Sequence, residues 1–568
     1  MNLNIEADKQ NTYDAIVVGT GISGGWAAKE LTEKGLKTLV LERGRDVKHV
    51  VDYPTMTKDP WQLPNADKIS AEELKLYPVQ SRTNWVTKAN KHWWVKDHED
   101  PYTEVKPFDW IRGYHTGGRS IMWGKQTYRL SDLDFKANLK DGVGVDWPVR
   151  YKEMSPWYDY VETFIGVSGR AEGLPQLPDG KFLPPMDLNC VEEVFRDKMA
   201  ETFNRTVTIG RVAHLTAALP HDPNRGICQS RNLCVRGCPY GAYFSSNAST
   251  LPAAERTGNM TLRPYSIVHS VIYDEKKGKA IGVRVLDGET KEEMEFYAKI
   301  IFLNASTLGS TFILLNSISN RFPNGLGNGS DQLGRNLMDH QYRAGADAKV
   351  DGFEDKYYVG RRPNGIYIPR FRNVGDDKHT DFIRGFGYQG EASRSNWARG
   401  VSEMAFGEEL KESLTSPGEW SIGITGFGEC LPYESNRVTI NSDKKDIHGL
   451  PTLNIDATWG DNEKAMRVDM KESAAEMLEA AGFKNVNTFD NPDNMGLGIH
   501  EMGTARMGKD PKTSVLNKWN QVHEAPNVFV TDGAAMTSSG CQNPSLTYMA
   551  LTARAADWAV SELKKGNL

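Results

Sequence analysis

Cysteine is scarce in this chain, with six residues among 568. So few thiols in so long a chain exclude the disulfide framework that holds many small secreted proteins together. Apolar runs are short, and none approaches the roughly 18 residues of a membrane-spanning helix, so we expect no direct membrane span. The net charge of −6, from 74 acidic and 68 basic residues, gives no reason to expect nucleic acid as a partner.

A secretion signal is not evident either, because residues 1–12 are polar and lack an apolar core. Two locations follow from this: the cytoplasm, or export of the folded chain on a partner that carries the signal. The length exceeds what one compact core accommodates, so we expect two interleaved domains or one domain with large insertions. The 53 glycines and 14 tryptophans suit a loop-rich α/β enzyme with an aromatic-lined pocket.

The N-terminal region has the pattern of a βαβ unit. Residues 15–18 (AIVV) read as a buried parallel strand, a glycine turn and a helix through Leu31 follow, and residues 38–42 (TLVLE) form the second strand. Two later passages look similar. The first runs from 299–303 into a helix near 310–315, and the second runs from 528–530 through Gly533 into a C-terminal helix ending near Lys564.

The pattern changes in the middle of the chain. Between about 345 and 490, alternating stretches such as 365–368 (GIYI) and 437–440 (RVTI) predict an antiparallel sheet that forms a substrate domain. Residues from about 51 to 110 are rich in Trp, Pro and charge with weak periodicity, which is more typical of an insertion than of a layer of the sheet.

The glycine turn carries a dinucleotide-binding pattern, Gly19-x-Gly21-x-x-Gly24, with Glu42 at the end of the second strand. Gly19 permits the tight turn, Gly21 lets backbone N–H groups approach a pyrophosphate, and Gly24 allows close packing of the helix. Glu42 would accept hydrogen bonds from the ribose hydroxyls. The bland alternative is a fortuitous glycine-rich turn, and the spacing alone does not separate FAD from NAD.

Three of the six cysteines are close together, as Cys228-x5-Cys234-x3-Cys238-Pro239. Thiolates are the usual iron–sulfur ligands, and this spacing lets one loop wrap a small cluster. The alternatives are a zinc site or reduced thiols; zinc normally takes four ligands, and only His221, seven residues upstream, is a nearby histidine. A cluster carries one electron at a time, which favours a dehydrogenase that feeds a downstream acceptor over an oxidase.

Several segments resemble the glucose–methanol–choline (GMC) oxidoreductases, which use FAD. They are residues 117–124 (GGRSIMWG), 334–340 (GRNLMDH) and 532–533 (DG). The resemblance implies that Gly117 and Gly118 lie against the flavin, with Ser120 in the same segment, and that Asp532 and Gly533 lie beside the pyrophosphate and ribityl chain. Related pyranose oxidases attach FAD to a histidine before the corresponding Trp. Met122 stands at that position here, so we predict non-covalent FAD.

The resemblance also implies a division of the chain. Residues 1–50, 105–135, 248–345 and 495–568 would form a Rossmann-type FAD-binding domain. Residues 51–104, 136–204 and 346–494 would form the substrate domain, and residues 205–247 the iron–sulfur segment.

By the same resemblance, His500 in 498–504 (GIHEMGT) and Asn543 in 542–545 (QNPS) match the family's His/Asn pair. Hydride leaves a carbinol carbon more easily as the hydroxyl proton departs, so a neutral imidazole serves as base and an amide orients the oxygen. The alternatives are a structural histidine and a helix cap. His340 is expected to fix a loop, while His115 could approach the flavin.

The cysteine spacing is similar to that of bacterial FAD-dependent glucose and fructose dehydrogenases, which implies a [3Fe-4S] cluster at Cys228, Cys234 and Cys238, or a cubane with a non-cysteine fourth ligand. Residues 305–311 (ASTLGST) look like those of glucoside 3-dehydrogenases, which produce 3-keto sugars. The resemblance therefore implies a periplasmic sugar dehydrogenase with a small subunit bearing an export signal and a cytochrome c-type acceptor. The alternatives are the large subunit of a gluconate, fructose or glucose dehydrogenase, an oxygen-using alcohol oxidase and a non-catalytic electron-transfer subunit.

Aromatic residues could contribute to substrate binding. Trp93, Trp94 and Trp397 could form a wall on which a sugar stacks, although a place in a core or lid is at least as common for tryptophan.

Overall fold

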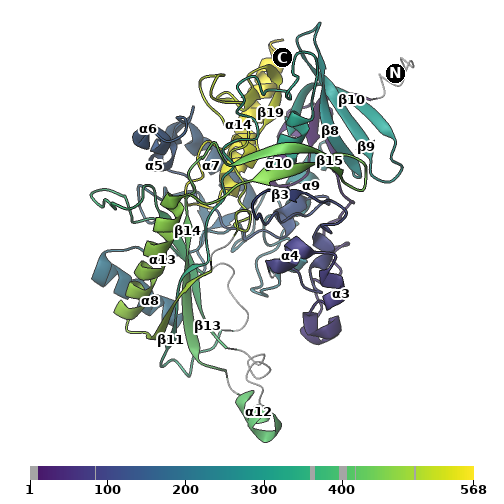
Figure 1. Ribbon diagram of the computed structural model, residues 1–568. Helices are drawn as coiled ribbons and strands as arrows, with labels where there is room; N and C mark the ends of the chain where they lie inside the picture. The colour runs from purple at the N-terminus through teal and green to yellow at the C-terminus, as the bar shows by residue number, and fades with distance from the viewer. Residues whose placement is uncertain (1–10, 84, 359–364, 396–405, 416, 492–493) are drawn as a thin grey trace.

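Two large β-sheets organise the computed structural model, which describes residues 11–83, 85–358, 365–395, 406–415, 417–491 and 494–568 (Figure 1). One sheet has eight strands, which come from residues 12–41, 260–303 and 521–530. The other has six strands and is built from the middle of the sequence. The α/β fold expected from the sequence is therefore present, with a second, antiparallel layer.

The core of the eight-stranded sheet is parallel, because apolar strands such as β1 and β2 are buried on both faces and helices cover them. The parallel strands, in spatial order, are β19 (Ala525–Val530), β10 (Glu293–Leu303), β1 (Thr12–Val18), β2 (Thr38–Leu41) and β7 (Met260–Arg263). The antiparallel additions are β8 (Ser266–Asp274), β9 (Lys279–Asp287) and β18 (Gln521–Val522).

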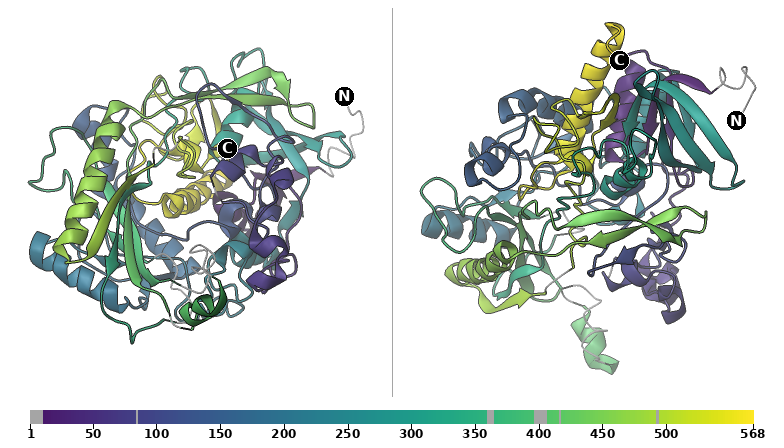
Figure 2. Two further views of the ribbon diagram at one scale, coloured as in Figure 1. Left: turned by 60° about the horizontal axis from the view of Figure 1, so that its bottom comes forward. Right: turned by 45° about the horizontal axis from the view of Figure 1, so that its top comes forward.

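Three helices that are distant from one another in the sequence cover one face of this sheet. They are α2 (Ile22–Glu33), α9 (Thr250–Arg256) and α14 (Ser545–Lys564), and Figure 2 shows α14 in yellow beside the purple N-terminal elements. The predicted C-terminal helix ending near Lys564 is confirmed. Helix α10 (Thr307–Leu315) packs against β8, and it begins three residues before the predicted start at Ser310.

The six-stranded sheet is antiparallel throughout. Its strands, in spatial order, are β17 (Lys484–Asp490), β11 (Ala344–Val350), β14 (Trp420–Gly428), β13 (Phe386–Arg394), β12 (Ile366–Ile368) and β6 (Thr208–Ile209). Helices α8 (Cys190–Phe203) and α13 (Asp461–Ala480) cover one face and bury its apolar side chains. Alternate residues of β14 are buried, as expected for a strand with one covered face.

Residues 437–440 do not belong to this six-stranded sheet, so the expectation of a single antiparallel sheet over 345–490 is wrong. They open β15 (Arg437–Lys445), which pairs with β16 (Pro451–Asp456) and β3 (Thr103–Glu104) in a separate three-stranded sheet. Alternation in a sequence shows that one face of a strand is buried, but it does not identify the neighbouring strand.

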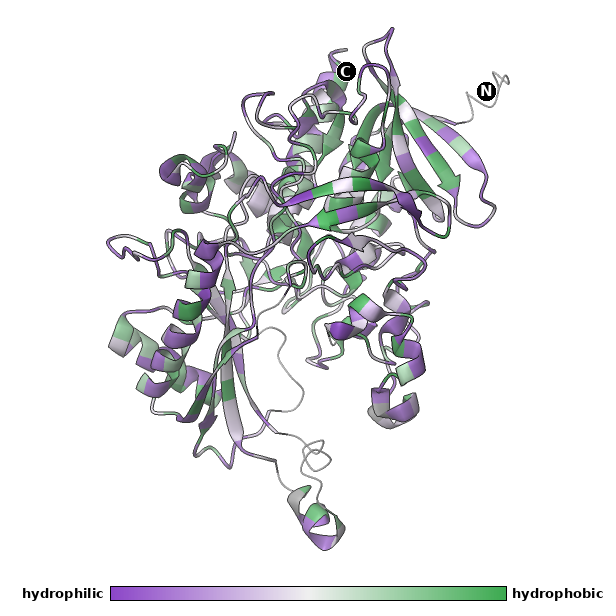
Figure 3. Ribbon diagram, viewed as in Figure 1, coloured by the Kyte–Doolittle hydropathy of each residue, from purple (hydrophilic) through white to green (hydrophobic). Residues whose placement is uncertain are grey.

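The remaining α-helices and strands are short apart from α7, which has 15 residues. They are α3 (Ala71–Leu74), α4 (Pro78–Arg82), α5 (Asp132–Phe135), α6 (Ala137–Asp141), α7 (Tyr151–Ile165), α12 (Gly407–Ser413), β4 (Val167–Ser168) and β5 (Phe182–Leu183). In Figure 3 the interior strands are largely green, whereas α3 and α13 carry purple segments. Across the described residues, no helix combines the length and apolarity that crossing a membrane requires.

Candidate active site and cofactor cavity

A cavity of about 800 Å³ lies between the two large sheets. One end is formed by the glycine turn after β1, including Gly19 and Gly21, and the other by His500 and Asn543. Gln389 on β13 contributes a wall from the six-stranded sheet. A single cavity therefore joins the predicted nucleotide site to the predicted catalytic pair.

The glycine turn has the geometry that its sequence predicts. Gly19 has a φ of +95°, and a Cβ there would lie 2.3 Å from the carbonyl oxygen of Asn304. A Cβ on Gly24 would lie 2.0 Å from the Gly19 carbonyl oxygen, so only glycine allows this contact. A Cβ on Gly21 would meet no atom within 4 Å, because this residue opens onto the cavity. The turn thus leaves room for a pyrophosphate beside the N-terminus of α2.

The Glu42 carboxylate lies at the edge of this turn. Its Oε1 accepts a hydrogen bond from the N–H of Gly44 (3.0 Å), and its Oε2 accepts bonds from the N–H (3.2 Å) and hydroxyl of Thr20. Burial raises the pKa of Glu42 above its ordinary value, while these donors oppose the rise. The carboxylate is thereby held in one orientation at the cavity wall.

The family motifs approach the cavity from two sides. Gly118, Ser120, Asp532 and Gly533 line it, whereas Gly117 lies behind the wall, where a Cβ would overlap the Asn247 side chain. The expected contact of Gly117 with the flavin stays a prediction. The Asp532 carboxylate accepts hydrogen bonds from the hydroxyl of Ser310 (2.6 Å) and the N–H of Ala534 (3.0 Å), and burial raises its pKa to about 6.

His500 and Asn543 face each other at the other end of the cavity. The Nδ2 of Asn543 lies 3.5 Å from the Nε2 of His500, and the Oδ1 of Asn543 accepts a hydrogen bond of 2.7 Å from the Nε2 of Gln389. The helix-cap alternative for Asn543 does not describe this arrangement, since Pro544 is the N-cap of α14 and the helix has no side-chain cap bond. The Asn543 amide is instead directed at the histidine.

The backbone before His500 is fixed by one buried carboxylate. Asp339 accepts N–H bonds from His340 (2.8 Å), Gly496 (2.8 Å), Gly498 (2.9 Å) and His500 (3.0 Å). Burial and the nearby Glu501 carboxylate raise the pKa of Asp339 to about 7, while the four N–H bonds favour its ionised form.

Local strain accompanies this arrangement. Ile499, the residue immediately before His500, has a φ of +59°, a conformation that β-branched residues rarely adopt. Such strain persists only where the surrounding contacts hold the segment in place, and here it turns the His500 side chain toward the cavity.

His340 contacts His500 directly, a role that its sequence motif did not reveal. Its Nδ1 lies 2.8 Å from the Nδ1 of His500, and its Nε2 lies 2.7 Å from the carbonyl oxygen of Gly540. The predicted role in fixing a loop agrees with the Gly540 contact. Burial lowers the pKa of His340 to about 4. Burial, then His340 and Arg119, lower the pKa of His500 well below its ordinary value, so both rings are neutral at neutral pH.

Other polar residues of the site were not predicted. The Arg119 guanidinium binds the Glu501 carboxylate through two hydrogen bonds, of 3.0 and 2.8 Å, next to His500. The Oε1 of Gln389 accepts a bond of 3.0 Å from the Nε2 of Gln126, whose Oε1 in turn accepts one of 2.6 Å from the Tyr128 hydroxyl. Gln126 and Gln389 line the cavity and present amides beside the catalytic pair.

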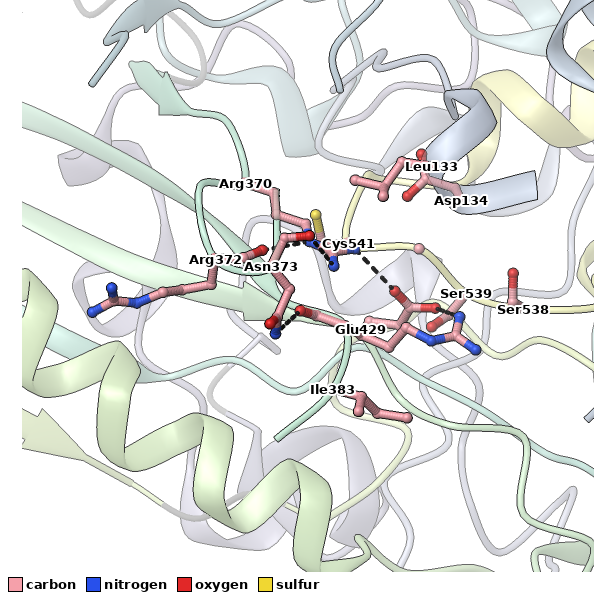
Figure 4. A network of polar contacts seen from close by, with 12 residues as sticks. Leu133, Asp134, Arg370, Arg372, Asn373, Ile383, Glu429, Ser538, Ser539 and Cys541 are labelled. Carbon is pink, nitrogen blue, oxygen red and sulfur yellow. Dashed lines mark hydrogen bonds and ion pairs between the residues drawn. The ribbon is translucent and has the colours of Figure 1, made fainter. Parts of the chain in front are cut away.

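A buried polar network lies behind the loop that carries Ser539 and Cys541 (Figure 4), and Asn543 follows two residues later in the chain. The hydroxyl of Ser539 accepts a bond from the N–H of Cys430 and donates one to its carbonyl oxygen, both 3.1 Å. The neighbouring Glu429 pairs with Arg384 at 2.9 Å, and both side chains are 1 % exposed. This ion pair therefore supports the loop from the protein interior.

The cysteine loop meets the same cavity from another side. Cys234 lines it together with Lys125 and His214, and the Nε2 of His214 lies 3.8 Å from the Cys234 Sγ. Cys228 and Cys238 are half-buried and lie behind the lining.

The histidine that approaches the cysteine loop differs from the one that the sequence suggested. The Nε2 of His221, the histidine considered from the sequence, bonds the carbonyl oxygen of Phe164 at 3.0 Å instead. His214, which lies further upstream, is the one that approaches Cys234. Within the ranges that the structure describes, no group of three or more His, Cys, Asp or Glu side chains could hold a metal ion.

The remaining predicted residues divide between the cavity and the core. Trp94 and Met122 line the cavity, whereas Trp93 is 1 % exposed and lies behind it. His115 is buried off the cavity and contacts the carbonyl oxygen of Thr116. Trp397 lies outside the described residues.

Family models described as GMC oxidoreductase match residues 13–342 and residues 432–552. The chain belongs to the GMC oxidoreductase family. It is accordingly an FAD-dependent oxidoreductase that acts on CH–OH donors, and the open Gly21 turn with Glu42 and Asp532 on the cavity wall suits that cofactor.

The 2-methyl-1,2-propanediol dehydrogenase of Mycolicibacterium austroafricanum is 27% identical and aligns over 96% of this chain and 94% of its own length. The fructose dehydrogenase large subunit of Gluconobacter japonicus is 27% identical over 97% of this chain and 98% of its own. A crystal structure of pyridoxine 4-oxidase from Mesorbium loti matches with a TM-score of 0.61 at 17% identity, covering 96% of this chain and 98% of that one. This last likeness supports the fold alone.

Proposed function

We propose that this chain oxidises a secondary hydroxyl group of a sugar or glycoside, and that the C3 hydroxyl of glucosides, giving 3-keto sugars, is its target. The observation that carries the proposal is the His500 and Asn543 pair, whose Nε2 and Nδ2 atoms lie 3.5 Å apart at the end of the nucleotide cavity. A neutral imidazole and an oriented amide at this place suit removal of a hydroxyl proton.

The protein's own residues divide the work of the reaction. The Nε2 of His500 takes the hydroxyl proton of the substrate, and the Nδ2 of Asn543 donates a hydrogen bond that holds the same oxygen. A positioned base of this kind is worth roughly 10²–10⁴ in rate. FAD, when bound, would supply the acceptor for the hydride that leaves the carbinol carbon.

The cavity wall favours a polyhydroxylated substrate over an apolar alcohol. Gln126, Gln389 and Glu391 line the cavity on the side of the six-stranded sheet, and amide and carboxylate groups hydrogen-bond readily to sugar hydroxyls. Trp94 adds an aromatic surface. The relative from Gluconobacter japonicus acts on fructose by its name, which fits the same substrate class.

The preference for C3 rests on residues 305–311, which resemble the corresponding segment of glucoside 3-dehydrogenases. This segment lies at the cofactor side, where Ser310 bonds Asp532, rather than against Asn543. It therefore supports the subfamily and not a direct contact with the sugar. Gluconate or fructose oxidation is the nearest alternative.

We also propose that Cys228, Cys234 and Cys238 hold an iron–sulfur cluster, of the [3Fe-4S] type. Three thiols on one loop, with the Lys125 ammonium nearby and Cys234 on the cavity wall, support it. The ligands of a cluster bind different irons and so stand further apart than those of a single ion. When bound, such a cluster carries single electrons, which suits an external acceptor such as a cytochrome c. A small subunit with an export signal and a periplasmic location belong to the same proposal.

The test is anaerobic bleaching of the purified flavoprotein by a panel of glucosides, glucose, gluconate and fructose, with the product ketone located by NMR. The proposal expects glucosides to bleach the flavin fastest and the ketone to be at C3. A panel that leaves the flavin oxidised would overturn it, and stoichiometric peroxide in air without an added acceptor would favour an oxidase. Iron analysis and EPR after anaerobic purification test the cluster.

A further inference from the structure

We infer that His340 is a positioning residue that sets the tautomer of His500, so that His500 presents an unprotonated Nε2 to the cavity. The inference rests on the proposed function, because it explains how His500 is ready to accept a proton. His340 does not line the cavity and does not contact the substrate position.

The hydrogen bonds of His340 leave a single arrangement for a neutral ring. The carbonyl oxygen of Gly540 can only accept, so the His340 Nε2 at 2.7 Å from it carries the proton. A neutral imidazole has one N–H, and the His340 Nδ1 is therefore an acceptor. The Nδ1 of His500, 2.8 Å away, must donate to it. With its proton on Nδ1, the neutral ring of His500 has a free lone pair on Nε2.

Asn543 gives a second, independent line of evidence. Its Oδ1 accepts the hydrogen bond from the Nε2 of Gln389, so its Nδ2 is the atom directed at His500. An amide nitrogen is a donor only, and it matches an unprotonated Nε2 on the histidine. The contacts of His500 with His340 and with Asn543 therefore both indicate the tautomer that carries its proton on Nδ1.

The buried surroundings of His340 favour this placement of the protons on the two rings. A doubly protonated His340 would donate from Nδ1 and force His500 into the opposite tautomer, with the proton on the wrong nitrogen. Burial disfavours that charged form, since His340 is 1 % exposed. The charged groups nearby are Asp339, which bonds the His340 and His500 N–H groups, and the Arg119–Glu501 pair.

One loop holds both His340, which orients His500, and Asn543. Gly540 supplies the carbonyl that orients His340, and Asn543 stands three residues later. A displacement of this loop would therefore disturb the histidine and the amide together. When His500 takes the substrate proton on Nε2, its Nδ1–H bond to His340 is retained, and no second proton has to move.

Three substitutions separate the roles of the two ring nitrogens. His340→Asn places an amide oxygen near the position of Nδ1 and keeps the acceptor. His340→Gln extends toward Gly540 but offers no acceptor at the Nδ1 position, and His340→Leu removes both contacts. His221→Asn, at an exposed histidine remote from the cavity, is the matched control.

The expected result is a loss in kcat with KM unchanged, because His340 lies outside the cavity. His340→Leu and His340→Gln should lower kcat about tenfold, the size of one lost hydrogen bond, with His340→Asn recovering most of it. His221→Asn should stay within about twofold. Equal losses in the Asn and Gln variants, or a rise in KM alone, would contradict the inference.

A spectroscopic measurement keeps the inference testable without turnover. Nitrogen-15 NMR of histidine-labelled, FAD-loaded protein reports which ring nitrogen carries the proton, and His500→Asn identifies the His500 signals. We expect the Nδ1–H form for His500 and the Nε2–H form for His340 in the wild type. An Nε2–H form for His500 would overturn the inference even if sugars bleach the flavin. An Nδ1–H form would uphold it even if no sugar in the panel reacts.

Discussion

The end of the cavity that contains His500 and Asn543 differs from the cysteine loop in the number of protein contacts that hold its side chains in place. At the catalytic end, Asp339 accepts four backbone N–H bonds, and both partners of the His500 and Asn543 pair are held from behind. The cysteine loop has fewer such contacts: the His214 ring lies 3.8 Å from the Cys234 Sγ, and Ser230 bonds Cys228.

The difference teaches that the two sites become ordered in different ways. The proposed catalytic pair, His500 and Asn543, is pre-organised by the polypeptide, which removes the cost of ordering it when substrate binds. The thiols, by contrast, have no comparable set of internal partners among the described residues, and a ligand would supply their order. Each prediction below disturbs one side of this comparison.

The largest effect is expected at the cysteine loop. Cys234→Ser should abolish the proposed cluster, because one of three thiolate ligands is lost. Iron content and the EPR signal should fall to background, and reduction of a one-electron acceptor should stop while sugars still bleach the flavin. Cys430→Ser, at a buried cysteine outside the loop, is the control and should retain its iron. Full iron content in Cys234→Ser would contradict the assignment.

The buried network behind the catalytic loop should be the next most sensitive. Among the described ion pairs, Arg384→Ala leaves the buried Glu429 carboxylate with Arg370 alone, at 3.9 Å, and breaking such a pair costs about 3–5 kcal/mol of unfolding free energy. Denaturant unfolding measures this. The exposed pair of Lys484 and Asp351 is the control, since Lys484→Ala should cost no more than about 1 kcal/mol. Similar losses in both variants would remove the distinction.

These two sites also show how far the sequence leads. Local motifs predicted the Gly19 turn, the C-terminal helix and the family. Each prediction depends on short runs of residues that are adjacent in the sequence. His500 and Asn543 were found by the same kind of motif. The contact of His340 with His500 joins residues 160 apart, and nothing in a short motif encodes it.

The sequence did not predict contacts between residues that are far apart along the chain. Gln389 reaches Asn543 from β13, and His214, rather than His221, approaches Cys234. Residues 437–440 lie in a strand as predicted, but β15 pairs in another sheet, because a periodic pattern does not identify the neighbouring strand. Short sequence motifs therefore predicted the proposed catalytic residues, but they did not predict the residues that hold them in place through tertiary contacts.

A smaller effect is expected when the support of Asn543 is removed. Gln389→Leu takes away the bond that directs the Asn543 amide, and the loss of one hydrogen bond should lower kcat about two- to tenfold. Stopped-flow bleaching of the flavin measures the step. Gln126→Leu is a matched comparison, one bond further from Asn543, and should have the weaker effect. A stronger effect for Gln126→Leu would mean that Gln126 acts on the substrate directly.

The smallest expected effect concerns the pH at which kcat/KM falls. Burial, His340 and Arg119 lower the pKa of His500, and a base works only when unprotonated, so kcat/KM should fall only well below pH 6.5. A profile from about pH 4 to 8 tests this. An inflection near pH 7 that disappears in Asp339→Asn would belong to Asp339. One at or above pH 6.5 that persists in that variant would contradict the account.

The most direct test of the whole account compares wild type and His500→Ala under anaerobic conditions, with the flavin spectrum followed after sugar is added. The account predicts rapid bleaching in the wild type, a rate lower by roughly 10²–10⁴ in the variant, and equal FAD content and dithionite reduction in both. A variant that sugar bleaches within a few-fold of the wild-type rate would show that the proton goes elsewhere.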